Sequence, residues 1–140
     1  MVIDVKNRTM LREIIIKVLY QVYILDKTSV KYDIDALIKE QSEIENEFIN
    51  TCVYGVIKYQ DEINEKANKY LENWTIDRLS KVDKAILSLG IYELIYTDTP
   101  SIVCINETIE LSKIYSDENV TSMINACMDK IYKEELDGRK

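Results

Sequence analysis

The residues of this sequence with the most specific chemistry are two arginines near its start. Arg8 and Arg12 are four positions apart, and on a helix this spacing places them about 40° from each other, on one side. Guanidinium groups bind phosphate oxygens, and Lys6 adds a third cation to the same segment. The whole chain of 140 residues carries a net charge of −7, which argues against a broadly basic nucleic-acid surface. We therefore expect any contact with a phosphate backbone to be local.

Enzymatic chemistry has few candidate residues here. The chain contains no histidine, which excludes Ser-His-Asp and Cys-His nucleophile pairs and every histidine metal site. It also lacks the glycine-rich motifs that bind nucleotide phosphates. Cys52, Cys104 and Cys127 are odd in number and far apart, so they predict buried reduced thiols and not a disulfide framework or a zinc site. We expect a non-enzymatic protein that needs no metal or cofactor.

The composition favours one all-α domain. A length of 140 residues is enough for a single sizeable core, and the apolar fraction of 46% is typical of a globular protein. Three glycines and one proline are too few for the many tight turns of a β protein. No run of apolar residues is long enough to span a membrane, and no secretory signal is evident. We therefore expect a cytoplasmic protein without membrane contact.

Amphipathic helices are predicted for the first half of the chain. In a helix over residues 6–25, Tyr20 lies off the apolar seam, and both partner contact and plain exposure are open for it. The three/four spacing of apolar residues runs through residues 44–71, which predicts one long helix. Gly55 in its middle costs about 1 kcal/mol relative to alanine, and the usual compensation is close approach of a neighbouring helix. The seam of the first helix consists of Leu11, Ile15, Val18, Val22 and Leu25.

The second half is organised around a helix that begins directly after Ser80. Ser80 and Asp83 have the spacing of a capping box, with aspartate in the place of glutamate. From there to Tyr96 nearly every residue is apolar, so this helix has to be buried on most of its surface. Thr99 can cap the next helix, and Pro100 suits its first position. The buried positions expected in that next helix are Ile102, Ile105 or Val103, Ile109, and Leu111 or Ile114.

Several short motifs occur in an order that is specific to one family. The longest is INETIELSK at residues 105–113, which is close to INEAIELAK in that family. The others are Leu19-Tyr20-Gln21, Asn73-Trp74, Asp77-Arg78-Leu79, Asp83-Lys84-Ala85-Ile86-Leu87, Tyr92-Glu93-Leu94, Pro100 and Ile124-Asn125. In this order they cover essentially the whole chain, and the sequence resembles the NusB family of transcription antitermination factors.

This resemblance implies a fold and a function. The fold is all-α, with six to seven helices in two packed sub-bundles, residues 1–72 and 73–140. The function is to bind the boxA RNA of ribosomal operon leaders as a heterodimer with NusE, a small-subunit ribosomal protein. That complex helps RNA polymerase to transcribe ribosomal operons without premature termination. Whether the chain is a monomer or a homodimer stays open.

The resemblance also assigns roles to individual residues. The arginine-rich segment of the family corresponds to Lys6, Arg8 and Arg12, which are expected to bind RNA. The second RNA surface of the family corresponds to the start of the last helix. Tyr20 and Asp83 are candidates for contact with NusE, although a role for Asp83 as a helix cap alone stays open. The candidate RNA contacts in the last helix are Asn119, Ser122, Asn125 and Met123, which stands where the family has an aromatic residue.

Alternatives remain for the function and for the polar residues. A protein-interaction module that has lost RNA binding would fit the negative charge and Met123. An accessory domain of an RNA methyltransferase is disfavoured, because no cofactor-binding fold follows in the sequence. Asn106 and Glu107 are expected to form a buried polar pair between helices in preference to an RNA contact. Glu93 is expected to pair with Arg78 or a lysine inside the protein.

Overall fold

The computed structural model describes residues 7–138, and this part of the chain is all-helical, without a strand. This confirms the predicted fold class. Within the described residues, no helix is long and apolar enough to span a bilayer. The elements are α1 (Arg8–Leu25), α2 (Ile34–Gln41), α3 (Glu47–Lys58), α4 (Gln60–Tyr70), the short 3-10 helix η2 (Ile76–Arg78), α5 (Lys81–Tyr96), α6 (Ser101–Tyr115) and α7 (Glu118–Glu135).

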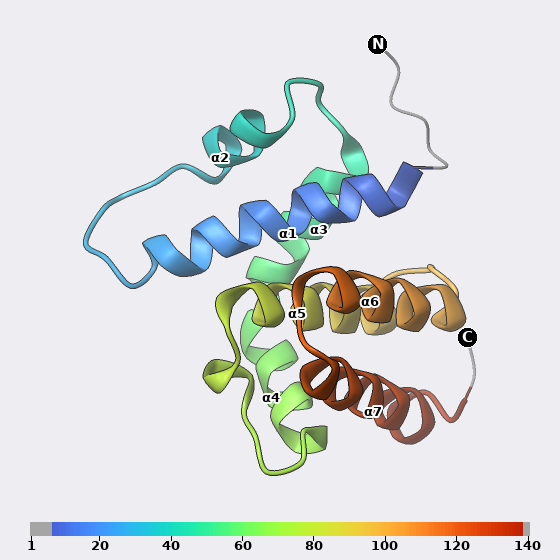
Figure 1. The fold of residues 1–140 in the computed structure, drawn as a ribbon. Coiled ribbons are helices and arrows are strands. Elements are labelled where there is room, and N and C mark those ends of the chain that lie inside the picture. The colour runs from blue at the N-terminus through green and yellow to red at the C-terminus, as the bar shows by residue number, and fades with distance from the viewer. Residues whose placement is uncertain (1–6, 139–140) are drawn as a thin grey trace.

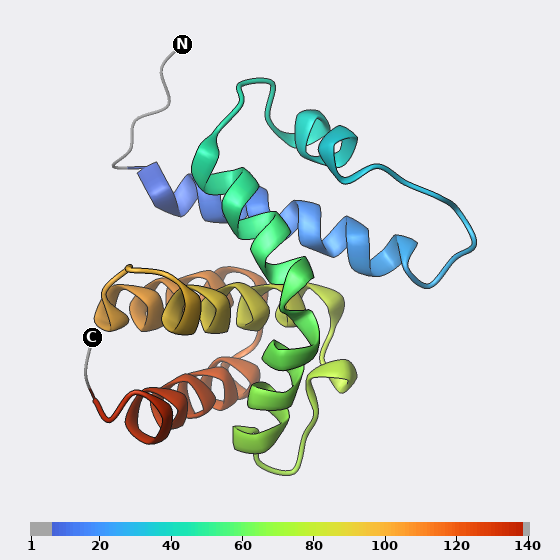
Figure 2. The ribbon, with the colours of Figure 1, turned by 180° about the vertical axis from the view of Figure 1, so that it is seen from behind.

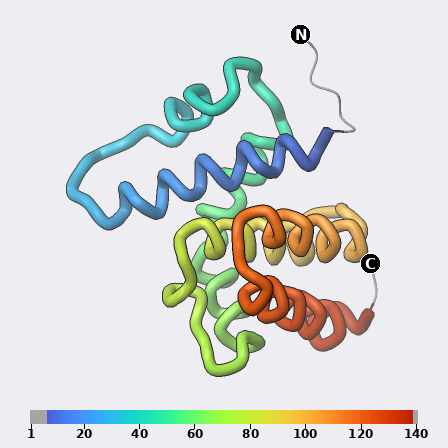
Figure 3. The backbone as a smooth tube through the Cα atoms, in the orientation of Figure 1, coloured from blue at the N-terminus to red at the C-terminus, as the bar shows by residue number. Residues whose placement is uncertain are grey.

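The helix α5 lies at the centre of the fold, as its apolar sequence predicts. It begins where expected, because the Ser80 hydroxyl accepts a hydrogen bond of 3.1 Å from the Asp83 N–H. Every residue from Ala85 to Leu94 is buried. Figures 1 and 3 show α1 and α3 on one side of α5 and α4 and α7 on the other, with α6 alongside. All the other long helices therefore take their positions from α5.

The prediction of one long helix over residues 44–71 is wrong, because the chain turns at Tyr59 and forms the two helices α3 and α4. Tyr59 has φ −102° and ψ 16°, and its ring stacks on Tyr96 with 4.3 Å between centroids. Before the turn α3 packs on α1, and after it α4 packs on α7 (Figure 2). The three/four spacing of apolar residues is the same before and after Tyr59, so it could not reveal that the neighbouring helix changes there. The division of the domain at residue 72 stays a prediction, and these contacts favour a division nearer Tyr59.

Gly55 in α3 has the close neighbour that its position predicts. A Cβ atom placed on it would lie 2.2 Å from Cζ of Tyr92 in α5. Tyr92 is itself buried, at 6% exposure. Glycine at position 55 therefore lets α3 approach α5 at the point where the two helices pack together.

The start and the buried face of α6 differ from the prediction. Pro100 is the residue before the helix and not its first residue, and Thr99 does not cap it. Instead the Thr99 hydroxyl donates to the Glu93 carboxylate at 3.3 Å. The apolar residues Ile102 and Ile114 are 68% and 62% exposed. Leu111 is buried as expected, but the other buried positions carry small residues, because α6 packs closely on α5. The buried residues of α6 are Ser101, Cys104, Thr108, Leu111 and Ser112.

The three cysteines are buried and free, as predicted. Burial raises the pKa of Cys52 and of Cys127 to about 12. A thiol with so high a pKa is protonated at neutral pH and is a poor nucleophile. The cysteines therefore contribute to packing.

A polar cross-link between α4 and α7 makes stability depend on pH. The Glu135 carboxylate accepts hydrogen bonds from the Lys66 ammonium and, at 2.6 Å, from the Tyr70 hydroxyl. The hydrogen bond from Lys66 and then that from Tyr70 lower the pKa of Glu135 from 4.5 to about 2. A carboxylate whose pKa is lower in the folded than in the unfolded chain stabilises the fold at pH values above the unfolded pKa. This contribution is lost as the pH falls towards 2.

We expect Glu135→Gln to remove part of the decrease in stability between about pH 4.5 and pH 2. Urea unfolding across this range measures the effect. Glu134→Gln removes the same charge from an exposed neighbour and serves as the control. Equal pH profiles for Glu135→Gln and the wild type would contradict the cross-link.

Candidate nucleic-acid interface

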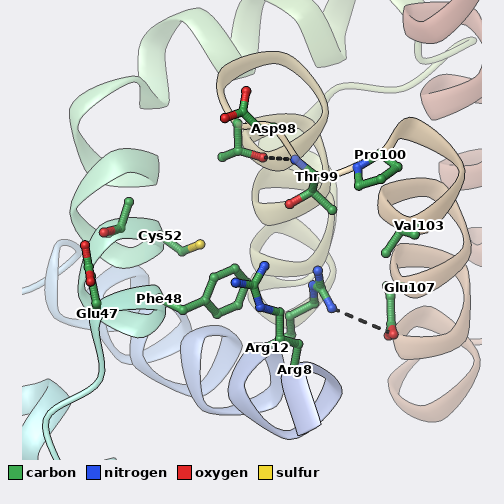
Figure 4. Close-up of a pocket in the computed structure, with 12 residues that line it drawn as sticks. Arg8, Arg12, Glu47, Phe48, Cys52, Asp98, Thr99, Pro100, Val103 and Glu107 are labelled. Atoms are coloured by element: carbon green, nitrogen blue, oxygen red, sulfur yellow. Dashed lines mark hydrogen bonds and ion pairs between the residues drawn. The ribbon is translucent and has the colours of Figure 1, made fainter. Parts of the chain in front are cut away.

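Arg8 lies at the exposed beginning of α1, at the edge of a cavity of 880 Å³. This cavity, called the α1 pocket below, is bounded by the starts of α1 and α3 and by the turn between α5 and α6 (Figure 4). The Arg8 guanidinium lies over the ring of Phe48, 4.4 Å from its centroid. No ion pair of Arg8 occurs among the described residues. Arg8 is thus held on an aromatic ring and remains accessible to a phosphate.

Arg12 has a different environment from Arg8, although both line the α1 pocket. It is only 2% exposed, and its Nε and Nη2 donate to the two Glu93 oxygens at 2.7 and 2.8 Å. Burial opposes the charge of Arg12, but the hydrogen bonds and charge of Glu93 outweigh this effect and raise its pKa. This corrects two expectations. Arg12 is engaged inside the protein and not presented to RNA, and the partner of Glu93 is Arg12 and not Arg78.

Carboxylates dominate the remaining charge of the α1 pocket. Glu47, Asp98 and Glu107 line it together with Arg12, whose charge is compensated by the buried Glu93. Glu107 is half-buried and accepts from the Thr9 hydroxyl at 2.9 Å, which links α6 to α1. The expected link between helices is therefore present for Glu107, whereas Asn106 is exposed. Among the described residues that line the pocket, Arg8 is the cation available to a phosphate.

A second concave surface follows the first turns of α7. It consists of two cavities of 290 and 330 Å³, which are both lined by Met123, and we call it the α7 groove. Asp117 caps the helix by accepting from the Val120 N–H at 2.9 Å. Of the predicted RNA contacts here, Met123 is half-buried and the other three are exposed. Those three are Asn119, Ser122 and Asn125.

Two aromatic residues of the α7 groove were not predicted as site residues. Trp74 is 37% exposed and lines one cavity, and the Arg78 guanidinium lies 4.2 Å from its ring centroid. Tyr70, at the end of α4, lines the other cavity. Together they supply the aromatic surface that Met123 lacks. Asn73-Trp74 was evident as a family motif, but Trp74 and Met123 are 49 positions apart in the sequence, and this separation concealed that they share a groove.

The two candidates for partner contact differ in exposure. Tyr20 is 38% exposed on the outer side of α1. Asp83 is 7% exposed and accepts a hydrogen bond from the hydroxyl of Ser116, just after the end of α6. Burial raises the pKa of Asp83. Asp83 thus offers a partner little surface, and its exposed part faces the α7 groove.

The α1 pocket and the α7 groove lie at opposite ends of α6. Pro100 and Val103, at the start of α6, line the α1 pocket, whereas Asp117, just after its end, lines the α7 groove. A helix of this length, 15 residues, spans about 22 Å. Lys6, the remaining predicted RNA contact, lies outside the described residues. The sequence prediction of two RNA surfaces therefore corresponds to two separate places in the fold.

Comparisons with known proteins agree on one family. Residues 9–133 match the sequence model of the NusB family. The chain is 41% identical over 128 residues to the transcription antitermination protein NusB of Acetivibrio thermocellus, which covers 89% of this chain and 88% of that protein. It is 36% identical over 127 residues to the protein of the same name from Bacillus subtilis, which covers 90% and 94%.

Solved structures share the fold. NusB of T. maritima gives a TM-score of 0.78 at 30% identity, over 91% of each chain. A chain from the crystal structure of the antitermination factors NusB and NusE in complex with dsRNA gives 0.74 at 27% identity, over 93% of this chain and 98% of that chain. The similarity therefore extends over the α1 pocket and the α7 groove together.

Proposed function

Because the chain belongs to the NusB family, we propose that it is a transcription antitermination factor that binds boxA RNA as a heterodimer with NusE. The relatives compared above are named as transcription antitermination proteins, and a solved relative is in a complex with NusE and RNA. The observation in this chain that carries the proposal is the exposed Arg8 on Phe48. We place its action in the cytoplasm, within the antitermination complex of RNA polymerase.

In this proposal RNA binds at two places. Arg8 contacts a phosphate at the α1 pocket, and unstacked bases bind along the α7 groove, where aromatic and amide side chains line the surface. One continuous strand that reaches both places has to extend along α6. Arg12 is not a contact in this proposal, since it holds Glu93 inside the protein.

NusE is proposed to bind an apolar stripe on the outer side of α1. Met10, Tyr20 and Ile24 are 50%, 38% and 37% exposed and lie on one helical face. Tyr115, at the end of α6, reaches this face and donates to Glu13 at 2.9 Å. Exposed aromatic and apolar residues of this kind form the centres of protein interfaces. A second copy of the chain is the competing occupant, and a molecular mass that rises with concentration in the absence of NusE would reveal it.

Arg8→Gln is expected to weaken boxA binding by the heterodimer, because it removes the accessible cation of the α1 pocket. The slope of log K against log salt should also become shallower by about 0.7 for one lost phosphate contact on a single strand. Binding measured over a salt series tests both effects. Lys39→Gln, which removes an exposed positive charge from α2, is the matched control.

A rival function is a protein-interaction module that binds NusE without RNA. The carboxylates of the α1 pocket favour it, because they repel phosphates. Recovery of the NusE complex with no RNA binding at moderate salt would support this rival. If RNA does bind but Arg8→Gln changes neither its affinity nor the salt slope, the assignment of Arg8 is wrong.

A further inference from the structure

The 290 Å³ cavity of the α7 groove has a chemistry of its own. It lies between η2 and the start of α7 and is lined by Trp74, Arg78, Asp83, Asp117 and Asn119, among others. We propose that this cavity, called the Trp74 cavity below, receives one unstacked RNA base and prefers a base with an amino group on its Watson–Crick edge. The inference rests on the proposed function, because it assumes that single-stranded RNA reaches the α7 groove.

The aromatic wall of the Trp74 cavity supports binding of a flat ring. Trp74 keeps 37% of its surface exposed although Arg78 covers part of the indole at 4.2 Å. Proteins bind single-stranded RNA by stacking unpaired bases on aromatic rings and on guanidinium planes. The cavity offers both surfaces side by side, and its volume is near the lower limit of about 300 Å³ for small-ligand sites.

The polar wall of the cavity selects hydrogen-bond donors. Asp117 and Asp83 provide carboxylate oxygens, which only accept when ionised. One Asp117 oxygen already accepts from the Val120 N–H, and one Asp83 oxygen accepts from Ser116. The remaining acceptor capacity suits the exocyclic amino groups of cytosine and adenine. Uracil presents the O4 carbonyl in the place of the cytosine amino group, and a carboxylate repels this oxygen. The one donor on this edge of uracil, N3–H, lies between two carbonyl oxygens.

The charges of the cavity favour a neutral base over a phosphate or a basic side chain. A phosphate group would meet the two aspartates of the wall. A lysine or arginine from a protein partner would attract the aspartates. It would, however, lie beside the Arg78 guanidinium, which is already over the Trp74 ring. Two cations at one ring repel each other. A base avoids both penalties, and the Arg78 charge can pair with the phosphate that follows it.

Trp74 is the only tryptophan of the chain, so its fluorescence reports on this cavity directly. We expect oligocytidine to quench Trp74 saturably, in the chain alone and in the heterodimer. Oligouridine of the same length should bind at least about fivefold more weakly. Trp74→Leu should lower the affinity for oligocytidine about 5- to 150-fold, whereas Trp74→Phe should retain most of it.

Asp117→Asn tests the preference for an amino group separately from stacking. Asparagine caps a helix as well as aspartate does, so the start of α7 should be preserved. The amide brings a donor to the wall, and the preference for cytidine over uridine should fall or reverse. Arg8→Gln is the control, because it should lower the affinity for both oligonucleotides and leave their ratio unchanged.

The outcomes separate this inference from the proposed function. Absence of RNA binding in the heterodimer would overturn both. RNA binding without a change in Trp74 fluorescence would overturn the inference alone, and so would equal affinities for cytidine and uridine. If NusE by itself alters Trp74 fluorescence and prevents quenching by RNA, a protein partner occupies the cavity and the inference is wrong.

Discussion

Arg12→Ala is expected to destabilise the protein by about 3–5 kcal/mol, because it removes the cation that compensates a buried carboxylate. Arg12 and Glu93 are each 2% exposed, and two hydrogen bonds of 2.7 and 2.8 Å join them. The loss is a large part of the stability of a small domain, which is about 5–15 kcal/mol. Urea unfolding of the variant beside the wild type measures it.

A double substitution distinguishes the loss of the ion pair from the loss of packing. Arg12→Met with Glu93→Leu replaces both charges by apolar groups of similar size, and such replacements are often neutral or stabilising. We expect the double variant to be much closer to the wild type than Arg12→Ala is. Arg8→Ala, one turn away on the exposed side of α1, should cost less than about 1 kcal/mol. A double variant as unstable as Arg12→Ala would show that the ion pair itself contributes net stability.

The same double variant tests whether Arg12 has any direct role in RNA binding. If Arg12 acts only by fixing α1 to α5, the folded double variant should bind boxA RNA with NusE as the wild type does. A loss of RNA affinity in a variant of normal stability would restore Arg12 to the RNA contacts. This design is needed because Arg12→Ala alone would lower binding simply through unfolding.

The position of Arg8 follows from this network. Glu93 accepts from Arg12 on α1 and from Thr99 in the turn before α6, and Glu107 of α6 accepts from Thr9. The start of α1 is thereby fixed to α5 and α6, and Arg8 is placed over Phe48 at the rim of the α1 pocket. The buried polar residues of the pocket thus position the one exposed cation that is available there among the described residues.

Local signals of the sequence predicted much of this fold. Ser80 and Asp83 correctly predicted the start of α5, and the apolar run that follows correctly predicted its central position. Gly55 correctly predicted that another helix approaches α3 closely at this point. These features depend on neighbouring residues or on the composition of one helix, and such information is present in a single sequence.

Features that depend on tertiary contacts were not predictable in this way. Tyr59, at the turn between α3 and α4, stacks on Tyr96, 37 positions away, and the pairing of Arg12 with Glu93 spans 81 positions. On a helical projection Arg12 lies at the border of the apolar seam, where a charged residue is usually exposed. Only the carboxylate from α5 explains its burial. The exposed arginine and the buried arginine could not be distinguished by spacing.

Gly90→Ala is the other substitution for which we expect a large effect on stability, because it overfills the contact between α5 and α6. A Cβ atom on Gly90 would lie 2.4 Å from Oγ1 and 3.0 Å from Cγ2 of Thr108, and 3.1 Å from Cε of Met128. Thr108 is 4% exposed, and its hydroxyl donates to the Cys104 carbonyl at 2.7 Å. It therefore cannot move without losing that bond or displacing α6.

Two opposing terms decide the size of the Gly90→Ala effect. Alanine favours a helix over glycine by about 1 kcal/mol. Overpacking of a core costs about 1–3 kcal/mol and sometimes more, and the contact of 2.4 Å places this site at the upper end. We expect a net loss of about 2 kcal/mol in the free energy of unfolding, measured by urea unfolding. Gly138→Ala, at a glycine with no neighbour within 4 Å, tests glycine replacement without a clash, although its φ of +67° adds backbone strain.

Thr108→Ala provides the test of the mechanism. Residue 108 is the position at which INETIELSK has threonine and INEAIELAK has alanine, so alanine there fits a helix of this kind. The substitution Thr108→Ala removes Oγ1 and Cγ2, the two Thr108 atoms that a Cβ on Gly90 would meet. The double variant with Gly90→Ala and Thr108→Ala should therefore be more stable than Gly90→Ala alone. If Thr108→Ala does not restore stability, the cost arises from Met128 or from a shift of α5, and the role of glycine at position 90 is not to admit the threonine side chain.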